Sequence, residues 1–348
     1  MPKETKHVPE RDITILAGDI GGTKTNLGLF RPQADGLNEI DSATYSSRKA
    51  GGLEEMITAL LARQSVSVSA ACFGVAGPVM AGAANLPNLD WSVSAANVRR
   101  KFSWQQVQII NDLVATAIAA PRLDPSALTS LNRGDPDTGG NLAVIAPGTG
   151  LGLALMIAES GRYQPVASEG GHADFAPNDE AEADLWRFCH QRFGHVSAER
   201  VLSGQGLVNI FEWLRASDGR EPIPAVLQAM ASEDPAAVIT HYALADEDAL
   251  CREALQRFCR IFGAVAGNFA LAGMATGGVY LGGGIPPKII PALQTSDFME
   301  SFTAKGRFRD FMQAIPVQVI CEDRAALLGA AQRAYELATL KGDEHGNG

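Results

Sequence analysis

Glycine-rich segments that follow apolar runs are the first candidates for chemistry in this chain. Near the start, Asp19 lies at the end of an apolar, β-branched run. The turn residues after it are Gly21, Gly22 and Thr23. Glycines let backbone N–H groups approach a phosphate closely, and a nearby carboxylate can hold Mg²⁺. Taken alone, this stretch is explained equally well by an ordinary hairpin with a glycine turn.

The same pattern recurs in the second half of the chain. An apolar run over 142–147 precedes the turn residues Gly148, Thr149 and Gly150. Another apolar run, 279–281, ends in Gly282, Gly283 and Gly284. The repeated hairpins predict related sheets that meet at a cleft, each offering a backbone cradle for phosphate. For the last turn, close packing of a helix on a strand is an equally good explanation.

A polar pair follows the strand-like run 107–110. Asn111 and Asp112 would then lie at the carboxyl end of a strand, where open α/β sheets bind ligands. Without further information, a simpler role is favoured, in which Asp112 caps the helix that begins at Leu113. The residues alone leave both roles open.

A second polar cluster contains carboxylates and an imidazole. Glu169 and His172 flank a pair of glycines that can bend the chain so that both side chains face one ligand. Glu199 supplies another carboxylate, whereas His195 is expected to be an ordinary core or surface histidine. Such groups satisfy sugar hydroxyls, which both donate and accept hydrogen bonds. A metal site is the alternative, but the spacing lacks the His or Cys pairs of structural metal sites.

Apolar spacing predicts the elements that must position these side chains. Helices are expected over 53–64, 115–120, 180–193, 203–216, 236–244, 247–275 and 324–340. Strands are expected over 70–76, 106–110 and 317–321, besides those of the glycine hairpins. Stretch 33–52 is expected to hold a third strand or a loop, and 85–91 a loop. The Pro- and Gly-rich stretch 121–140 is the expected crossover between domains.

Length and charge exclude several classes of protein. The 348 residues are enough for two domains, and the formal net charge of −10 argues against a nucleic-acid partner. The charged N-terminal stretch 1–12 has no apolar core of a signal peptide. Residues 261–287 carry no charge, but their glycines and Asn268 favour a buried helix and strand over a membrane span.

Cysteine usage indicates a reducing compartment. The five cysteines are Cys72, Cys189, Cys251, Cys259 and Cys321. Their odd number and the lack of a Cys-x-x-Cys pair argue against a disulfide framework or a zinc knuckle. We expect reduced, mostly buried thiols and a cytoplasmic protein.

Together, Asp-x-Gly-Gly-Thr, Gly-Thr-Gly and Gly-Gly-Gly resemble the sugar kinases of the actin-like, hexokinase-type ATPase fold. Ile-Ile-Asn-Asp and Glu-Gly-Gly-His, with most of the chain from Ile13 to about Leu340, resemble bacterial glucokinases. The resemblance implies a two-domain α/β, actin-like ATPase (ribonuclease H-like) fold with a duplicated β-hairpin/α core and an interdomain cleft. A small domain is expected over 1–122 plus 323–348, with the first phosphate loop and the catalytic Asp. A large domain over 123–322 is expected to hold the second phosphate loop and to bind sugar and adenosine.

The resemblance also implies a role for each candidate residue. Positions that contact glucose in bacterial glucokinases match Asn111, Asp112, Glu169, His172 and Glu199, and Asp112 is the expected general base. Gly74, Gly77 and 85–88 match the region that closes over the sugar. The expected ATP-binding residues are Gly21, Gly22, Thr23, Gly148, Thr149, Gly150, Gly282, Gly283 and Gly284. Asp19 is expected to orient Mg²⁺.

The implied activity is ATP-dependent phosphorylation of D-glucose to glucose 6-phosphate by a homodimer. The alternative is a kinase of another hexose, such as mannose, fructose or an N-acetylated sugar. It stays open because Lys24, Thr25 and Ser168 depart from the glucokinase pattern. A non-catalytic sugar-sensing regulator is the third reading, although such relatives usually place a helix-turn-helix before the first strand.

Overall fold

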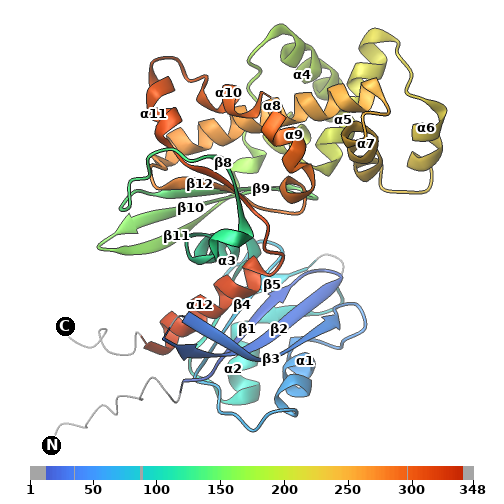
Figure 1. Cartoon of the computed structure of the whole chain (residues 1–348). Helices are drawn as coiled ribbons and strands as arrows, with labels where there is room; N and C mark the ends of the chain where they lie inside the picture. Colours follow the sequence, from blue (N-terminus) through green and yellow to red (C-terminus); the bar gives the residue numbers. More distant parts are fainter. Residues whose placement is uncertain (1–12, 35, 87–88, 296, 340–348) are drawn as a thin grey trace, which may run out of the picture. The chain divides into compact units, whose positions relative to one another are not determined.

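The computed structural model describes residues 13–34, 36–86, 89–295 and 297–339. Contacts divide the chain into two compact units (Figure 1). The first unit comprises Met1–Leu123 with Asp323–Gly348, and the second comprises Asp124–Glu322. Each unit is built on a mixed sheet with its own helices, as the α/β expectation required.

The first unit holds a five-stranded sheet in the order β3-β2-β1-β4-β7. The strands are β1 (Ile15–Ile20), β2 (Lys24–Gln33), β3 (Gly36–Ser46), β4 (Ala70–Val75) and β7 (Val107–Asn111). β1 pairs antiparallel with β2 and parallel with β4, which in turn pairs parallel with β7. Every residue of β1 except Asp19 is buried, so the strand fixes this carboxylate at the edge of an apolar core.

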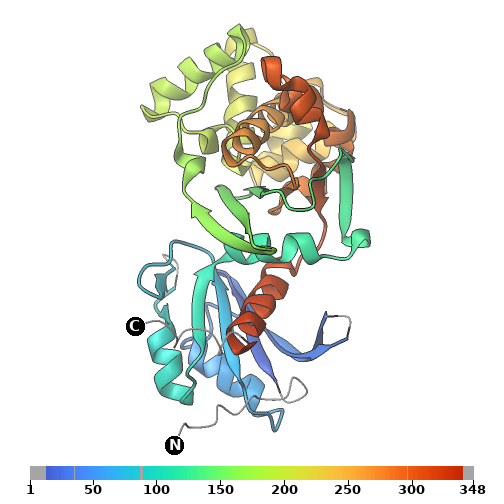
Figure 2. The same ribbon diagram turned by 90° about the vertical axis from the view of Figure 1, so that its left-hand side faces the viewer.

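Helices of the first unit come from both ends of the chain. They are α1 (Leu53–Leu61), α2 (Ala95–Phe102), α3 (Asp112–Ala119) and α12 (Ala325–Thr339). Figures 1 and 2 both show α12, in red, against the strands of the N-terminal sheet. Its contact with α3 requires a glycine, because a Cβ at Gly329 would lie 1.7 Å from the Ala115 carbonyl oxygen. The last helix therefore completes the core of the first unit.

The second unit holds a six-stranded sheet in the order β11-β10-β9-β12-β13-β8. The strands are β8 (Leu128–Asn132), β9 (Leu142–Pro147), β10 (Leu151–Glu159), β11 (Arg162–Ser168), β12 (Gly278–Leu281) and β13 (Val317–Ile320). β9 pairs antiparallel with β10 and parallel with β12, which pairs parallel with β13. This is the pairing pattern of β1, β2, β4 and β7, so the core is duplicated as the hairpins predicted.

Helices cover one face of this second sheet (Figure 1). They are α4 (Glu180–Phe193), α5 (Gly204–Asp218), α6 (Pro224–Met230), α7 (Pro235–Leu244), α8 (Ala249–Gly273), α9 (Ile290–Thr295), α10 (Phe298–Thr303) and α11 (Arg309–Ala314). The uncharged stretch 261–287, which raised the question of a membrane span, forms the second half of α8 and then β12, and most of both is buried in the core of this unit. In the described part of the chain, no helix combines the length and apolar character that a bilayer crossing needs.

Several short elements were not predicted. A small sheet of β5 (Ala83–Asn85) and β6 (Ser92–Ser94) flanks the stretch 85–91 that was expected to be a loop. Residues 87–88 of that stretch lie outside the described residues. The expected crossover contains β8, an edge strand whose side chains are only partly buried. Such segments gain their structure from a partner strand, as β8 does from β13, rather than from their own periodicity. The expected helix at 115–120 begins earlier, at Asp112.

The cysteines are all free, as expected. Four are buried, and Cys321 is exposed. Burial raises the pKa of the Cys72 thiol to about 12, so this group stays protonated and behaves as a small apolar side chain.

Candidate active site

In the first unit, Asp19 lies beside a tight glycine turn. The Gly21 N–H donates to the Lys24 carbonyl at 3.0 Å, which closes the turn between β1 and β2. Asp19 faces Asn26 across the hairpin, and Asn26 Nδ2 donates to Asp19 Oδ2 at 3.3 Å. The Thr44 hydroxyl donates to Asn26 Oδ1 at 2.9 Å, which fixes the direction of this amide. Burial raises the pKa of Asp19, and the Asn26 hydrogen bond and the Lys24 charge oppose that shift.

The polar pair lies where β7 meets α3. The cap of α3 is Asn111, because its Oδ1 accepts hydrogen bonds from the backbone N–H groups of Leu113 (2.9 Å) and Val114 (3.3 Å). Asn111 Nδ2 donates to the Gly77 carbonyl at 3.1 Å. The simpler reading of Asp112 as the cap is therefore wrong. Asp112 is the first residue of the helix instead.

Asp112 has a strongly perturbed carboxyl group. Its pKa is raised from 3.8 to about 6, first by burial and also by the negative charge of Asp19. The Leu113 N–H, which donates to Asp112 Oδ1 at 2.9 Å, holds the pKa below the value that burial alone would give. A carboxyl group with a pKa near the working pH can accept a proton from a hydroxyl that is being phosphorylated.

In the second unit, the two glycine turns lie side by side. The Gly148 N–H donates to the Gly150 carbonyl at 2.8 Å and closes the turn between β9 and β10. Gly282 donates to the Ile145 carbonyl at 2.9 Å. Gly283 has φ +84°, and a Cβ there would lie 2.6 Å from the Pro147 carbonyl oxygen. This close approach joins the ends of the neighbouring parallel strands β9 and β12.

The Glu-Gly-Gly-His loop packs against the start of β10. Its glycines form the short 3₁₀ helix η4 (Gly170–His172), and the His172 N–H donates to the Glu169 carbonyl at 3.0 Å. A Cβ at Gly171 would lie 2.1 Å from the Leu151 carbonyl oxygen, so the approach requires glycine. The loop then forms a β-bridge between Asp174 and Ser197.

That bridge places Glu199 beside the loop. Glu199 lies in the 3₁₀ helix η5 (Ala198–Arg200). Its Oε1 is 4.0 Å from His172 Nδ1, and its Oε2 accepts the Leu151 N–H at 2.9 Å. The turn at 148–150, the Glu-Gly-Gly-His loop and Glu199 therefore converge on the first residue of β10.

His195 lies near this cluster but is an exposed histidine, with its Nε2 2.9 Å from Asp174 Oδ1. Among the described residues, no group of three or more His, Cys, Asp or Glu side chains is arranged to hold a metal ion. The alternative interpretation of the polar cluster as a metal site thus gains no support from the described part of the chain.

Comparison with known proteins shows the family. The family model for glucokinase matches residues 16–337. A glucokinase of Yersinia enterocolitica is 40% identical over 316 residues, which cover 90% of this chain and 94% of that protein. The chain belongs to the glucokinase family. It is therefore a hexose-phosphorylating transferase for which ATP is a substrate.

Further relatives agree with this family assignment. A glucokinase of Pectobacterium atrosepticum is 37% identical over 316 residues, covering 91% of this chain and 95% of that protein. The crystal structure of a glucokinase from an Antarctic psychrotroph superimposes with a TM-score of 0.84 at 32% identity, covering 93% and 99% of the two chains. A glucokinase from Streptomyces griseus of the ROK family, in complex with glucose and AMPPNP, has a TM-score of 0.60 at 22% identity, covering 93% and 99%. That match shows the glucokinase/ROK actin-like fold alone.

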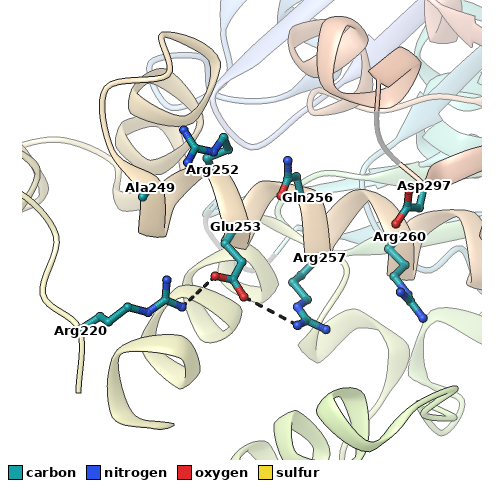
Figure 3. Close-up of a pocket in the computed structure, with 8 residues that line it drawn as sticks. All are labelled: Arg220, Ala249, Arg252, Glu253, Gln256, Arg257, Arg260 and Asp297. Atoms are coloured by element: carbon teal, nitrogen blue, oxygen red, sulfur yellow. Dashed lines mark hydrogen bonds and ion pairs between the residues drawn. The ribbon is translucent and has the colours of Figure 1, made fainter. Parts of the chain in front are cut away.

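A cavity of about 390 Å³ in the second unit is lined by none of the predicted site residues (Figure 3). In Figure 3, Arg220 and Arg257 of this cavity converge on Glu253, at 2.8 and 3.7 Å. Arg252 pairs with Asp246, and Arg260 pairs with Asp179 at 2.9 Å. Each arginine thus has a carboxylate partner, so this glucokinase-family chain has a balanced ion-pair network there rather than a convergent anion site.

Proposed function

We propose that this chain transfers the γ-phosphoryl group of ATP to the 6-hydroxyl of D-glucose, with Asp112 as the general base. The hydroxyl oxygen would bond to phosphorus as the bond to the ADP oxygen breaks, while the Asp112 carboxylate takes the hydroxyl proton. The observation that carries this role is the pKa of about 6 for Asp112. At pH 7 such a group is about 90% ionised, yet it is far more basic than an ordinary aspartate.

Sugar binding is assigned to Asn111, Glu169, His172 and Glu199. Their oxygens and ring nitrogens offer the mixture of donors and acceptors that sugar hydroxyls need. Support comes from the second unit, where His172 and Glu199 lie 4.0 Å apart on segments joined by a β-bridge. The proposal requires both units to act on one sugar and one ATP.

Phosphate binding is assigned to the turns at 21–23 and 148–150, and adenosine binding to the turn at 282–284. A Cβ at Gly22, Gly148 or Gly284 would meet nothing within 4 Å, and none of the three has a φ that favours glycine. The fold itself therefore does not require glycine at these positions. Close approach of a ligand to the backbone explains them better.

Asp19 is the residue that would hold Mg²⁺. Proteins bind this ion through one or two carboxylates together with substrate phosphates, so a single carboxylate beside a phosphate turn suits it. When bound, Mg²⁺ would neutralise charge on the phosphates. The chain's own contribution is to keep Asp19 ionised and oriented, which the hydrogen bond from Asn26 favours.

A panel of sugars tests the substrate. The kcat/KM for phosphoryl transfer from Mg-ATP should be higher with glucose than with mannose, fructose or N-acetylglucosamine. Faster turnover of another hexose would keep the mechanism and replace the substrate. Sugar binding without turnover of any sugar would point to a non-catalytic sensor and overturn the proposal.

The assembly and the compartment are further parts of the proposal. We infer a homodimer, as the family resemblance implies. A molecular mass in solution of twice the monomer mass, measured by light scattering, would support it. We also infer the cytoplasm, because the free thiols suit a reducing compartment.

A further inference from the structure

The segment from Glu199 to Gly204 is fastened at both ends to the Gly-Thr-Gly turn. At one end, Glu199 Oε2 accepts the Leu151 N–H at 2.9 Å. At the other end, the Gly204 N–H donates to the Gly148 carbonyl at 2.8 Å. Within the segment, the Ser203 hydroxyl donates to the Glu199 carbonyl at 2.8 Å. The carboxylate and the turn are therefore held as one unit.

Gly150 makes the first of these contacts possible. A Cβ at this position would lie 2.5 Å from Glu199 Oε2 and 3.3 Å from its Cδ, and no other group would come within 4 Å. Gly150 does not have a positive φ, so its backbone does not need glycine. A side chain here would meet the Glu199 carboxylate alone and would have to displace it.

Gly148, two residues earlier, offers a matched comparison. A Cβ there would meet nothing within 4 Å, and its φ is also not positive. The two glycines of one turn thus differ in the space beside them. Only the space beside Gly150 is filled by a side chain, that of Glu199, which we propose binds the sugar.

We propose that Gly150 is a positioning residue for the sugar and that the Glu199–Leu151 contact couples sugar binding to the phosphate turn. This inference rests on the proposed sugar-binding role of Glu199 and the proposed phosphate-binding role of the turn. One carboxylate oxygen is anchored on the backbone of the turn, and the other lies on the side of His172, where a sugar hydroxyl can bind. A shift of the turn on nucleotide binding then moves the carboxylate, and the reverse holds by linkage.

Glucose affinity without nucleotide tests the positioning role. Isothermal titration of glucose into Gly150→Ala should give a dissociation constant raised by about tenfold or more, because an added methyl displaces the carboxylate by roughly 1 Å. Gly148→Ala should bind glucose within about twofold of the unmodified protein, whatever it does to nucleotide binding. Unchanged glucose affinity in Gly150→Ala would overturn the inference.

A double variant shows whether Gly150 acts through Glu199. In a Glu199→Ala background the clash is gone, so adding Gly150→Ala should leave glucose affinity unchanged. This test also covers the case in which Gly150→Ala alone fails to fold, because the double variant relieves the overlap. A further loss of affinity in the double variant would refute an action through the carboxylate.

The coupling has its own measurement. In the unmodified protein, glucose should lower the AMPPNP dissociation constant several-fold. The ratio of the AMPPNP dissociation constants without and with glucose should approach one in Gly150→Ala. An unchanged ratio in that variant would overturn the coupling. Glu199→Ala separates the two levels of the argument. If Glu199→Ala binds glucose normally, the proposed sugar role of Glu199 fails, whereas if it binds poorly and Gly150→Ala binds normally, only this inference fails.

Discussion

Replacing Asp112 with Asn should stabilise the fold above pH 6 while removing the proposed base. The pKa of Asp112 rises from 3.8 to about 6 on folding, which disfavours the ionised carboxylate by roughly 3 kcal/mol. Asn carries no charge and avoids this cost. That cost already includes the favourable hydrogen bond from the Leu113 N–H at the start of α3, which lowers the pKa. The free energy of unfolding of the variant should therefore be roughly 3 kcal/mol larger at pH 8.

The size of this effect changes with pH in a defined window. Because the folded-state pKa lies above the unfolded value, the unmodified protein loses stability as pH rises from about 4 to about 6. The increase in the free energy of unfolding of Asp112→Asn should be full above pH 6 and absent near pH 4. Thermal unfolding of both proteins at pH 4.5, 6 and 8 measures it, with Asn111→Asp as a control that alters the true cap. A variant that is destabilised equally at every pH would refute the electrostatic reasoning.

Further predictions concern the pH profile, Asn26 and the core. The kcat/KM for glucose should fall about tenfold per unit below pH 6 as Asp112 is protonated, and a plateau down to pH 4.5 in rate measurements would contradict the raised pKa. Asn26→Ala should raise the Mg²⁺ concentration needed for half-maximal AMPPNP binding, because it removes the donor that orients Asp19 and lowers its pKa; an unchanged Mg²⁺ titration would count against an orienting role. Gly329→Ala should lower the unfolding free energy by about 2 kcal/mol or more, since its Cβ would overlap a carbonyl of α3, whereas Gly139→Ala, with no contact under 3.8 Å, should be nearly neutral. Equal melting temperatures for these two variants would contradict the packing argument.

Long periodic elements could be predicted from the sequence because their own patterns determine them. The helix expected over 180–193 matches α4 (Glu180–Phe193), and that over 324–340 matches α12 (Ala325–Thr339) within a residue at each end. The repeated glycine hairpins also indicated the duplicated sheets. β8 was missed because its pairing with β13, rather than its own periodicity, stabilises it. α2 was also missed, although Ser94 caps its start and Ala95 and Val98 form its buried side.

The details of the candidate site depend on contacts across the fold, which the sequence alone does not reveal. The capping role shifted from Asp112 to Asn111, a difference of one residue that depends on where β7 ends. Asn26 was not predicted as a partner of Asp19, because counting outward from a Gly21-Gly22 turn pairs Asp19 with Lys24, whereas the Gly21–Lys24 hydrogen bond sets a register that pairs Asp19 with Asn26. The contact between Glu199 and the Leu151 N–H joins residues 48 positions apart, so no local pattern signals it.

The most direct test of the central claim compares glucose phosphorylation and glucose binding in the unmodified protein and Asp112→Asn. Initial rates with Mg-ATP should fall by about 10²–10⁴-fold in the variant, the usual contribution of a general base. The dissociation constant for glucose, measured by titration without nucleotide, should change by less than about threefold, because Asn keeps the shape of the side chain and one acceptor oxygen and can still hydrogen-bond a sugar hydroxyl through its NH₂ group. Turnover in Asp112→Asn within tenfold of the unmodified protein would contradict the assignment of Asp112 as the base.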